Sequence, residues 1–286
     1  MEVLRGEVGF CFGVRRAVAI LSEASLRYRQ IVSLGPVVHN RHVVGQLAAK
    51  GVVSGTIDDL GRRSSVTPSP DGRVLAVTAH GASPDVFTRA YERGIALVDT
   101  TCPTVRKAQG IVESLARSDI PVVIFGDPDH TEIKALAARN RRVLIAEEPL
   151  NLKELRGYVG LVSQTTKPLD RYVDFYLRMK ELNPGITFGY HETICKSVTR
   201  RIRRAKELSK SVELMLVIGD RMSANTKNLL AICSEVGEAH LIENRDEIDE
   251  GWLRGRKVIG ITSGTSTPME VIEEVEKYLR EFGDGA

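Results

Sequence analysis

The chain is poor in aromatic residues, which make up 5% of its 286 positions, and it contains one tryptophan. Neither sign of charge is in large excess, because 40 Lys and Arg stand against 37 Asp and Glu, for a net charge of +3. This balance excludes a disordered acidic chain and argues against a dedicated nucleic-acid binder, in which basic residues dominate and cluster. The length is sufficient for a large core, in one domain or in two to three smaller ones.

Long apolar runs are also missing. No stretch approaches the roughly 18 apolar residues that a membrane helix needs. The first seven residues, MEVLRGE, contain no apolar signal-peptide core. We therefore expect a cytoplasmic protein that binds neither membrane nor nucleic acid. We also expect a monomer or a weak homodimer.

Cysteine is scarce, with residues only at positions 11, 102, 195 and 233. A disulfide framework is not expected in a reducing compartment, and neither a CxxC motif nor a Cys/His zinc pattern occurs. What is present is a regular spacing, since Cys11, Cys102 and Cys195 lie 91 and then 93 positions apart. Spacing alone does not exclude chance, because isolated cysteines are ordinary small core residues.

The neighbourhoods of these three cysteines also repeat. Each is followed three positions later by valine and soon afterwards by arginine, and each opens a stretch of helical periodicity. We therefore expect each cysteine at or just before a helix N-terminus. The partial positive charge there lowers the pKa of a thiol and stabilises a thiolate ligand.

Two further features recur in each copy. An apolar strand ends at Gly35, Gly126 and Gly219, with the same offsets as the cysteines, and a later apolar strand runs into a small polar turn and a proline. Histidine, carboxylate, hydroxyl and amide side chains follow these strand ends. The residues concerned are His39, His80, His130, Glu132, Thr165, Ser223, Asn225 and Ser266.

Strands that alternate with helices predict an α/β fold with buried, largely parallel sheets. We predict a trefoil of three similar α/β units with pseudo-threefold symmetry, over residues 13–101, 102–194 and 195–286. The last unit is completed by the N-terminal segment 1–12. The carboxyl ends of parallel strands carry the ligand site, so the three cysteines and the polar turns would converge at one centre. Residues 61–72 are expected to form an exposed loop.

Three converging thiolates can hold zinc with a histidine as the fourth ligand, or a 4Fe–4S cluster with one open iron site. Ligand softness alone does not decide between them. A closed structural zinc site needs no ring of polar side chains, whereas an open iron beside such a ring resembles a substrate site. Small donors with available backbone N–H groups are also what a phosphate needs.

Other chemically capable residues are interpreted as structural. His42, His191 and His240 fall outside the repeat, and Cys233 lies in an apolar run. A basic run is interpreted as a solvated helix face, although it could also steer an acidic redox partner. That run comprises Arg200, Arg201, Arg203 and Arg204.

Eight short strings around these positions resemble the LytB/IspH family of 4-hydroxy-3-methylbut-2-enyl diphosphate reductases, over about residues 8 to 280. They are GFCFGV (9–14), GPVVHN (35–40), AHG (79–81), TCP (101–103), QTT (164–166), IC (194–195), Ser223 with Asn225, and Ser266 before Pro268.

The resemblance implies one 4Fe–4S cluster at the centre of the trefoil, held by Cys11, Cys102 and Cys195, whose fourth iron takes the substrate hydroxyl. It implies that Glu132 delivers protons and that Thr165 orients the hydroxyl. It also implies two-electron reductive dehydroxylation to isopentenyl and dimethylallyl diphosphate, the last step of the non-mevalonate pathway, with electrons from a ferredoxin or flavodoxin. The residues implied to hold the diphosphate are His39, His80, Ser223, Asn225 and Ser266, with His130 close by as a third catalytic candidate.

Two departures from the family pattern concern the substrate. Thr131 replaces a proline, and Ala224 replaces a second serine whose hydroxyl would contribute about 1 kcal/mol of diphosphate binding. A related cluster reductase acting on another allylic or phosphorylated alcohol therefore remains an alternative. A non-catalytic redox sensor is disfavoured because it needs neither Glu132 nor Thr165. A zinc hydrolase is the weakest alternative.

Overall fold

The computed structural model describes the backbone of residues 1–60 and 73–285. The segment 61–72, expected to be an exposed loop, lies outside the described residues. Within the described ranges, none of the helices combines the length and the apolar character that crossing a bilayer requires.

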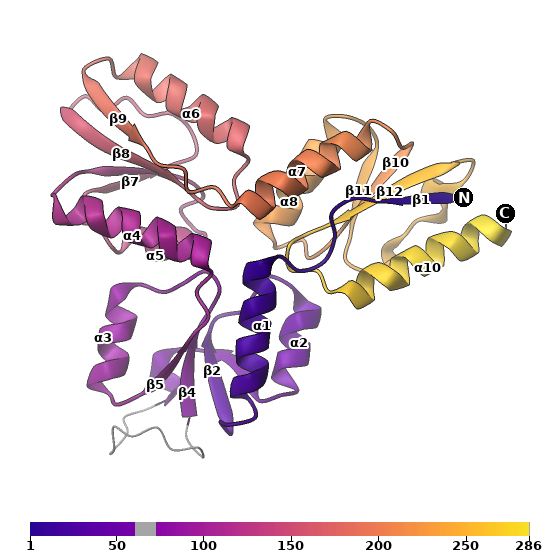
Figure 1. The fold of residues 1–286 in the computed structure, drawn as a ribbon, viewed down its shortest axis with the longest axis horizontal. Coiled ribbons are helices and arrows are strands. Elements are labelled where there is room, and N and C mark those ends of the chain that lie inside the picture. The colour runs from indigo at the N-terminus through magenta and orange to yellow at the C-terminus, as the bar shows by residue number, and fades with distance from the viewer. Residues whose placement is uncertain (61–72, 286) are drawn as a thin grey trace. The chain divides into compact units, whose positions relative to one another are not determined.

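The described strands form three separate four-stranded sheets, and all the strand pairings are parallel (Figure 1). The first sheet has the order β3-β2-β4-β5, the second β7-β6-β8-β9 and the third β1-β12-β10-β11. The bounds are β1 Glu2–Arg5, β2 Gln30–Leu34, β3 Val52–Gly55, β4 Arg73–Val77, β5 Ala96–Asp99, β6 Val122–Phe125, β7 Val143–Ala146, β8 Gly157–Ser163, β9 Ile186–Tyr190, β10 Leu214–Ile218, β11 Ala239–Ile242 and β12 Val258–Ser263.

The described helices connect these strands. Their bounds are α1 Phe12–Ala24, α2 Arg41–Ala48, α3 Pro84–Glu92, α4 Pro103–Arg117, α5 Thr131–Ala137, α6 Leu169–Leu182, α7 Lys196–Ser209, α8 Ala224–Ser234, α9 Glu250–Leu253 and α10 Met269–Gly285, with short 3-10 turns at Ile57–Leu60 and Arg245–Glu247.

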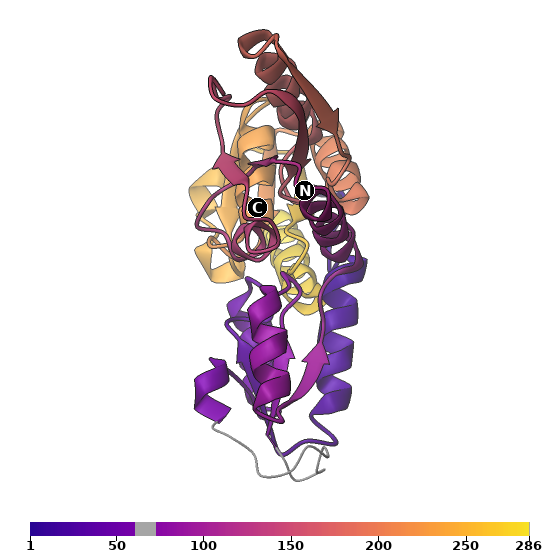
Figure 2. The ribbon, with the colours of Figure 1, turned by 90° about the vertical axis from the view of Figure 1, so that its left-hand side faces the viewer.

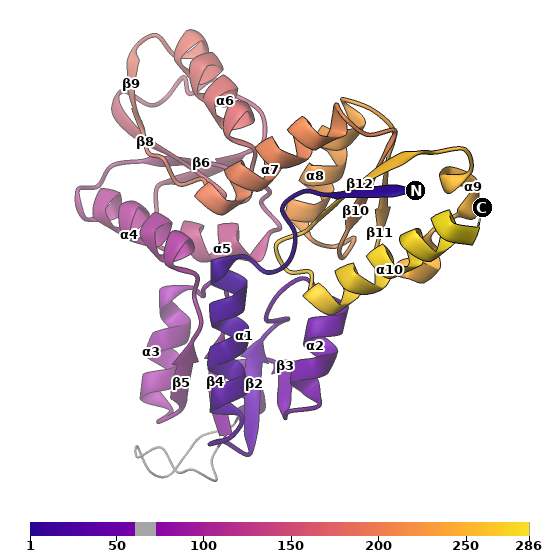
Figure 3. The same cartoon turned by 45° about the vertical axis from the view of Figure 1, so that its right-hand side comes forward.

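The three sheets share one topology. In each, the strand that precedes a cysteine stands at an edge, as β1, β5 and β9 do, and pairs with the last strand of the repeat, β12, β4 or β8. The N-terminal strand β1 completes the sheet of the C-terminal third, where it runs beside β12 (Figure 3). The prediction of an α/β fold built from three similar units is therefore confirmed.

The chain divides into two compact units. Unit 1 comprises Met1–Arg15, Val38–Gln46 and Lys196–Ala286, and unit 2 comprises Arg16–Val37 and Leu47–Cys195. Unit 1 contains the sheet of β1, β12, β10 and β11, while unit 2 contains the other two sheets. The finer division at residues 13–101, 102–194 and 195–286 stays a prediction.

The sheet of unit 1 is buried on both faces. Leu214, Leu216 and Ile218 of β10 pack into one apolar cluster, with residues of β12 and α10. The alternate residues Met215 and Val217 pack into a second cluster, with residues of α7 and α8. A strand covered on both faces is apolar at every position, which is why β10 reads as one apolar run rather than an alternating one.

Unit 2 repeats this arrangement. Val123 and Phe125 of β6 pack into one cluster with residues of α6, while Val122 and Ile124 pack into another with residues of α4 and α5. Each such fully buried side chain contributes roughly 1.5–3 kcal/mol. In the neighbouring sheet of the same unit, α3 lies beside β5 (Figure 2). Packing on both faces fixes the strands, and this in turn positions the segments that follow their carboxyl ends.

Candidate active site

The three repeated cysteines occupy the same backbone setting. Each cysteine N–H donates a hydrogen bond to the carbonyl oxygen of the residue two positions beyond the end of a strand. The bonds run from Cys11 to Thr265 at 3.0 Å, from Cys102 to Ala79 at 3.0 Å and from Cys195 to Thr165 at 2.9 Å. The strands concerned are β12, β4 and β8, which occupy equivalent places in the three sheets.

Each of these cysteines directly precedes a helix. The helices α1, α4 and α7 begin at the next residue in every case, so the predicted position is confirmed. All three side chains are partly exposed, and no disulfide involves any of the four cysteines, which all lie in the described part of the chain. Cys233 is fully buried among apolar side chains, as expected of a core residue. The thiolate is the form of cysteine that binds metal.

Unit 2 contains a buried carboxylic acid beside Thr165. Glu132, on α5, is 1% exposed, and its carboxylate accepts hydrogen bonds from the Thr165 N–H at 2.7 Å and the Thr165 hydroxyl at 2.8 Å. Burial raises the pKa of Glu132 to about 7, against the opposing effect of these two bonds. A group with this pKa is half protonated near neutral pH, which suits it to deliver protons.

Two histidines lie near this acid in the same unit. His130 is the N-cap of α5, and its Nδ1 accepts a hydrogen bond from the Glu132 N–H at 3.2 Å. The ring of His80 contacts the ring of His130 edge to face, with centroids 5.4 Å apart. Unit 2 thus brings together four sequence-predicted residues: His80, His130, Glu132 and Thr165.

A contact in unit 2 that the sequence did not reveal joins α4 to Cys195. The Thr104 hydroxyl lies 3.9 Å from the Cys195 sulfur, within hydrogen-bonding range for sulfur. Thr104 stands two residues after Cys102, so the first turn of the helix that follows one cysteine reaches the next cysteine. Thr104 is close to Cys102 in sequence, but its contact with Cys195 depends on how α4 packs against the sheet of β6, β8 and β9.

Unit 1 contains the other predicted site residues, His39, Ser223, Asn225 and Ser266. His39 lies in the segment Val38–Gln46, and its carbonyl oxygen accepts a hydrogen bond from the Ser266 hydroxyl at 2.9 Å. Asp220, which no motif in the sequence singles out, accepts hydrogen bonds from the Arg41 N–H at 3.1 Å and the Met222 N–H at 2.7 Å. Asp220 therefore links the His39 segment to the turn before Ser223.

The electrostatic environment of His39 combines opposing effects. Burial is the largest and lowers its pKa, the Asp220 charge raises it, and the Lys227 charge lowers it further. The net effect is a lowered pKa, so neutral imidazole is favoured more than in an exposed histidine.

The N-terminus of α8 presents the remaining predicted pair. Ser223 is the N-cap, and its hydroxyl accepts a hydrogen bond from the Thr226 N–H at 3.4 Å. Asn225 is 3% exposed, yet neither its Oδ1 nor its Nδ2 has a hydrogen-bond partner among the described residues. An unpartnered buried amide is costly, so a ligand that supplies partners would explain its retention.

One interpretation of the basic run was wrong. Arg200, Arg203 and Arg204 are exposed, as expected of a solvated helix face, but Arg201 is 1% exposed. The side chain of Arg201 points inward from α7 because backbone carbonyl oxygens of Gly9, Ser263 and Gly264 accept its hydrogen bonds.

These donors fit an iron–sulfur group in chemical type. Unit 1 offers Cys11, and unit 2 offers Cys102 and Cys195, each at a helix N-terminus. Thiolates are the ligands that iron–sulfur clusters use. The orphaned amide of Asn225 and the helix N-terminus at Ser223 fit a bound anion, such as a phosphate group.

Comparison with known proteins identifies the family of the chain. The family model described as LytB protein matches residues 3–280. The chain is 36% identical to the 4-hydroxy-3-methylbut-2-enyl diphosphate reductase of Dehalococcoides mccartyi strain CBDB1, an alignment that covers 98% of this chain and 97% of the relative. It is 34% identical to the reductase of the same name from Geobacter metallireducens, with coverage of 98% and 97%.

Two solved structures are also similar. One is E-1-hydroxy-2-methyl-but-2-enyl-4-diphosphate reductase from Plasmodium falciparum, 25% identical, with a TM-score of 0.85 over 98% of this chain and 87% of that chain. The other is (E)-4-hydroxy-3-methyl-but-2-enyl diphosphate reductase, described as the terminal enzyme of the non-mevalonate pathway. It is 27% identical, with a TM-score of 0.70, and covers 98% of this chain and 100% of that chain. The family match and the relatives both extend over nearly the whole chain, which therefore belongs to the LytB protein family.

Proposed function

We propose that this chain is an iron–sulfur reductase that acts on 4-hydroxy-3-methylbut-2-enyl diphosphate. Two electrons and two protons convert the substrate to isopentenyl or dimethylallyl diphosphate, and its hydroxyl group leaves as water. The reaction is the last step of the non-mevalonate route to isoprenoids.

The observation that carries this proposal is the equivalent backbone setting of the three cysteines, each held by a hydrogen bond to the turn after a strand. In the proposal, Cys11, Cys102 and Cys195 hold one 4Fe–4S cluster, around which the three α/β units are arranged with pseudo-threefold symmetry. When bound, the cluster supplies electrons one at a time and a Lewis-acidic iron.

The proton chemistry is assigned to the buried acid. Below a pH of about 7, Glu132 carries a proton that it can donate to the departing hydroxyl. The Thr165 hydroxyl, bonded to Glu132 at 2.8 Å, orients the acid and the substrate hydroxyl. His130 takes a supporting role, because its Nδ1 fixes the first turn of α5 through the Glu132 N–H.

The diphosphate is assigned to neutral donors and histidines rather than to a lysine clamp. We assign it to His39, Ser223, Asn225 and Ser266 of unit 1 and to His80 of unit 2. Hydrogen bonds of this kind are stronger where water is excluded, and the burial of Ser223, Asn225 and Ser266 supports this assignment. A reducing cytoplasm suits a protein that needs three thiolates.

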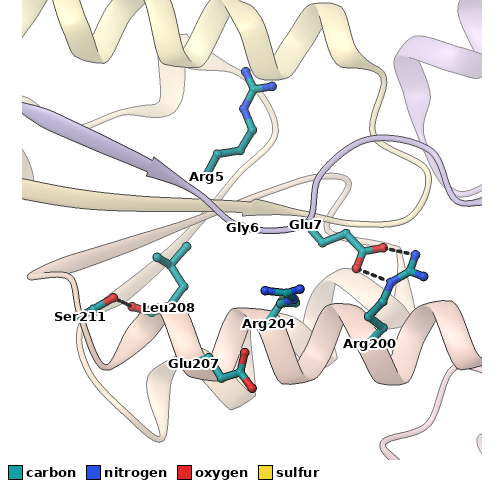
Figure 4. Close-up of a pocket in the computed structure, with 8 residues that line it drawn as sticks. All are labelled: Arg5, Gly6, Glu7, Arg200, Arg204, Glu207, Leu208 and Ser211. Atoms are coloured by element: carbon teal, nitrogen blue, oxygen red, sulfur yellow. Dashed lines mark hydrogen bonds and ion pairs between the residues drawn. The ribbon is translucent and has the colours of Figure 1, made fainter.

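The electron donor is proposed to be an acidic one-electron carrier, a ferredoxin or flavodoxin. Helix α7 begins one residue after Cys195 and contains six basic residues and one acidic residue. Along it runs a groove of about 520 Å³ against the segment Arg5–Glu7. Figure 4 shows Arg200 bonded to Glu7 and Arg204 beside the groove, whereas Arg5 points away from α7. A surface of this sign accelerates encounter with an acidic partner.

The first test uses protein purified and reconstituted without oxygen. Iron and sulfide content is measured, and electronic spectra are recorded before and after addition of 4-hydroxy-3-methylbut-2-enyl diphosphate. About four irons per chain, as a 4Fe–4S cluster requires, together with a spectrum that responds to the substrate and turnover in a reduction assay, would support the proposal. Protein that acquires no iron under these conditions would contradict it.

Two outcomes would favour the alternatives. Zinc without labile sulfide would indicate a zinc site instead of a cluster. A complete cluster whose spectrum ignores the substrate would indicate a related reductase for another alcohol, for which the loss of a hydroxyl at Ala224 is the motivating observation.

A further inference from the structure

The residue two positions before each cysteine is tied to the end of a strand. The Thr100 hydroxyl donates to the carbonyl oxygen of Val77, the last residue of β4, at 2.6 Å. The Thr193 hydroxyl donates to the carbonyl oxygen of Ser163, the last residue of β8, at 2.8 Å, and accepts from the Ser163 N–H at 2.7 Å. A threonine side chain thus makes the same connection in both sheets of unit 2.

This connection restrains the cysteines that follow. Two residues past each strand end stands the carbonyl that accepts the cysteine N–H. The threonine bond and the cysteine bond therefore join the same two segments at neighbouring points. A cysteine held in this way has its backbone fixed before any ligand binds.

The third sheet cannot use a threonine. The position two before Cys11 is Gly9, which has a left-handed backbone with φ of +79°. A Cβ atom at Gly9 would lie 2.7 Å from the Met269 sulfur. A β-branched residue is therefore excluded by both conformation and space.

Arg201 makes the missing connection from α7. Its guanidinium donates to the Ser263 carbonyl oxygen at 2.6 Å and to the Gly9 carbonyl oxygen at 2.8 Å. Ser263 is the last residue of β12, and so it is the counterpart of Val77 and Ser163. Arg201 also donates to the Gly264 carbonyl oxygen at 3.1 Å, and the Ser263 hydroxyl accepts from the Gly9 N–H at 2.9 Å.

Arg201 is a charged side chain in a fully buried position. Among the described residues it is the largest fully buried side chain, and it donates hydrogen bonds to carbonyl and hydroxyl oxygens of unit 1. A guanidinium stays protonated in proteins, so a positive charge is fixed beneath the segment that carries Cys11. Burying a charge is costly, and hydrogen bonds to carbonyl groups offset only part of that cost.

We propose that Arg201 is the positioning residue for Cys11, replacing in the third sheet the threonine that serves the other two. It clamps the Gly9 segment to the turn after β12, and its positive charge favours the reduced state of a metal group bound at Cys11. This inference rests on the proposed function only in taking Cys11 as a metal ligand. The clamp itself stands on the hydrogen bonds above.

Three variants separate the clamp from the charge. Arg201→Met removes both, Arg201→Lys keeps the charge but loses the fork, and Ser263→Ala keeps the charge but loses the hydroxyl that binds Gly9. Arg203→Met, exposed on the same helix, is the control. In the reconstituted full chain, iron release to a chelator and the midpoint potential of the metal group are measured.

We expect Arg201→Met to release iron about tenfold faster than the parent protein, as loss of charge-assisted hydrogen bonds implies, and to have a more negative potential. Arg201→Lys should restore the potential but not the retention of iron. Ser263→Ala should lose iron faster at an unchanged potential, and Arg203→Met should match the parent protein. Parental iron release and potential in Arg201→Met would overturn the proposal. If Arg201→Met does not fold, parental iron release in both Arg201→Lys and Ser263→Ala would overturn it.

Amide hydrogen exchange in the metal-free full chain tests the clamp separately. We expect faster exchange at the Cys11 amide in Arg201→Met and Ser263→Ala, with the Cys102 amide unchanged. If the parent protein holds no iron, the proposed function fails while this measurement still decides the clamp. Unchanged exchange at Cys11 in both variants would refute the clamp.

Discussion

A carboxylic acid can supply protons near neutral pH only if its pKa is brought close to 7, and burial on α5 does this for Glu132. Glu132→Gln keeps the shape of the side chain and can still accept the Thr165 N–H. We expect turnover to fall by about 10²–10⁴-fold with cluster content and substrate affinity retained. Single-turnover reduction of a loaded enzyme checks this, with the exposed Glu148→Gln as control. Parental turnover in Glu132→Gln would remove Glu132 as the proton donor.

The same raised pKa makes stability depend on pH. The pKa rises from 4.5 to about 7 on folding, so between these values the folded state binds more protons than the unfolded state. The stability gained from protonated Glu132 is complete below pH 4.5 and is lost as pH rises through about 7. Thermal unfolding should therefore show Glu132→Gln becoming more stable relative to the parent protein between pH 5 and pH 8. A constant difference in Tm would contradict the raised pKa.

Thr165 opposes the effect of burial, because its two hydrogen bonds favour the charged carboxylate. Thr165→Val removes the hydroxyl bond and leaves the backbone bond. We expect the pKa of Glu132 to rise further, so the alkaline limb of the pH–rate profile should move to higher pH while the maximal rate falls. The exposed Thr187→Val is the matched control. An alkaline limb that moves to lower pH would show that another group controls it.

At the scale of single elements, the first turn of α8 combines a helix N-terminus with an amide that has no partner. Asn225→Leu replaces the unsatisfied amide with an apolar side chain of similar size. We expect the ligand-free chain to gain stability and its affinity for inorganic diphosphate to fall by about tenfold or more. Calorimetry and titration measure the two effects, with the exposed Asn151→Leu as control. Loss of stability together with unchanged binding would contradict a ligand role for Asn225.

The helix N-termini after the cysteines could be predicted from the sequence, whereas the orientation of Arg201 on α7 could not. The repeated cysteines predicted three helix N-termini, because the apolar periodicity that follows each cysteine is a local signal that depends on no distant contact. The inward orientation of Arg201 was not predictable in this way. Its partners include the backbone carbonyl groups of Gly9, Ser263 and Gly264. Because every residue has a backbone carbonyl, the residue types at these positions do not indicate that they bind an arginine.

For the whole molecule, the threefold repeat was readable because each copy has to build its own parallel sheet with a polar turn at the same end. The N-terminal segment 1–12 was expected to complete the last copy, and its strand β1 pairs with β12. The sequence did not predict that Val38–Gln46 belongs to unit 1. This segment is bonded to Asp220 and Ser266, which are far from it in sequence and lie in the same unit.

The charge of the whole chain is nearly balanced, but α7 concentrates five exposed basic residues on one helix that starts beside a proposed cluster ligand. Long-range attraction for an acidic carrier depends on such a local excess and weakens with salt. We expect Arg203→Glu with Arg204→Glu to reduce the rate supported by reduced ferredoxin about tenfold or more at low ionic strength. The deficit should shrink at high salt, and the rate with a small chemical reductant should be unchanged.

Arg178→Glu, exposed on α6, serves as the control for net charge. Equal losses with both reductants would mean that the substitutions damage the catalytic centre, and no loss with ferredoxin would place its docking surface elsewhere.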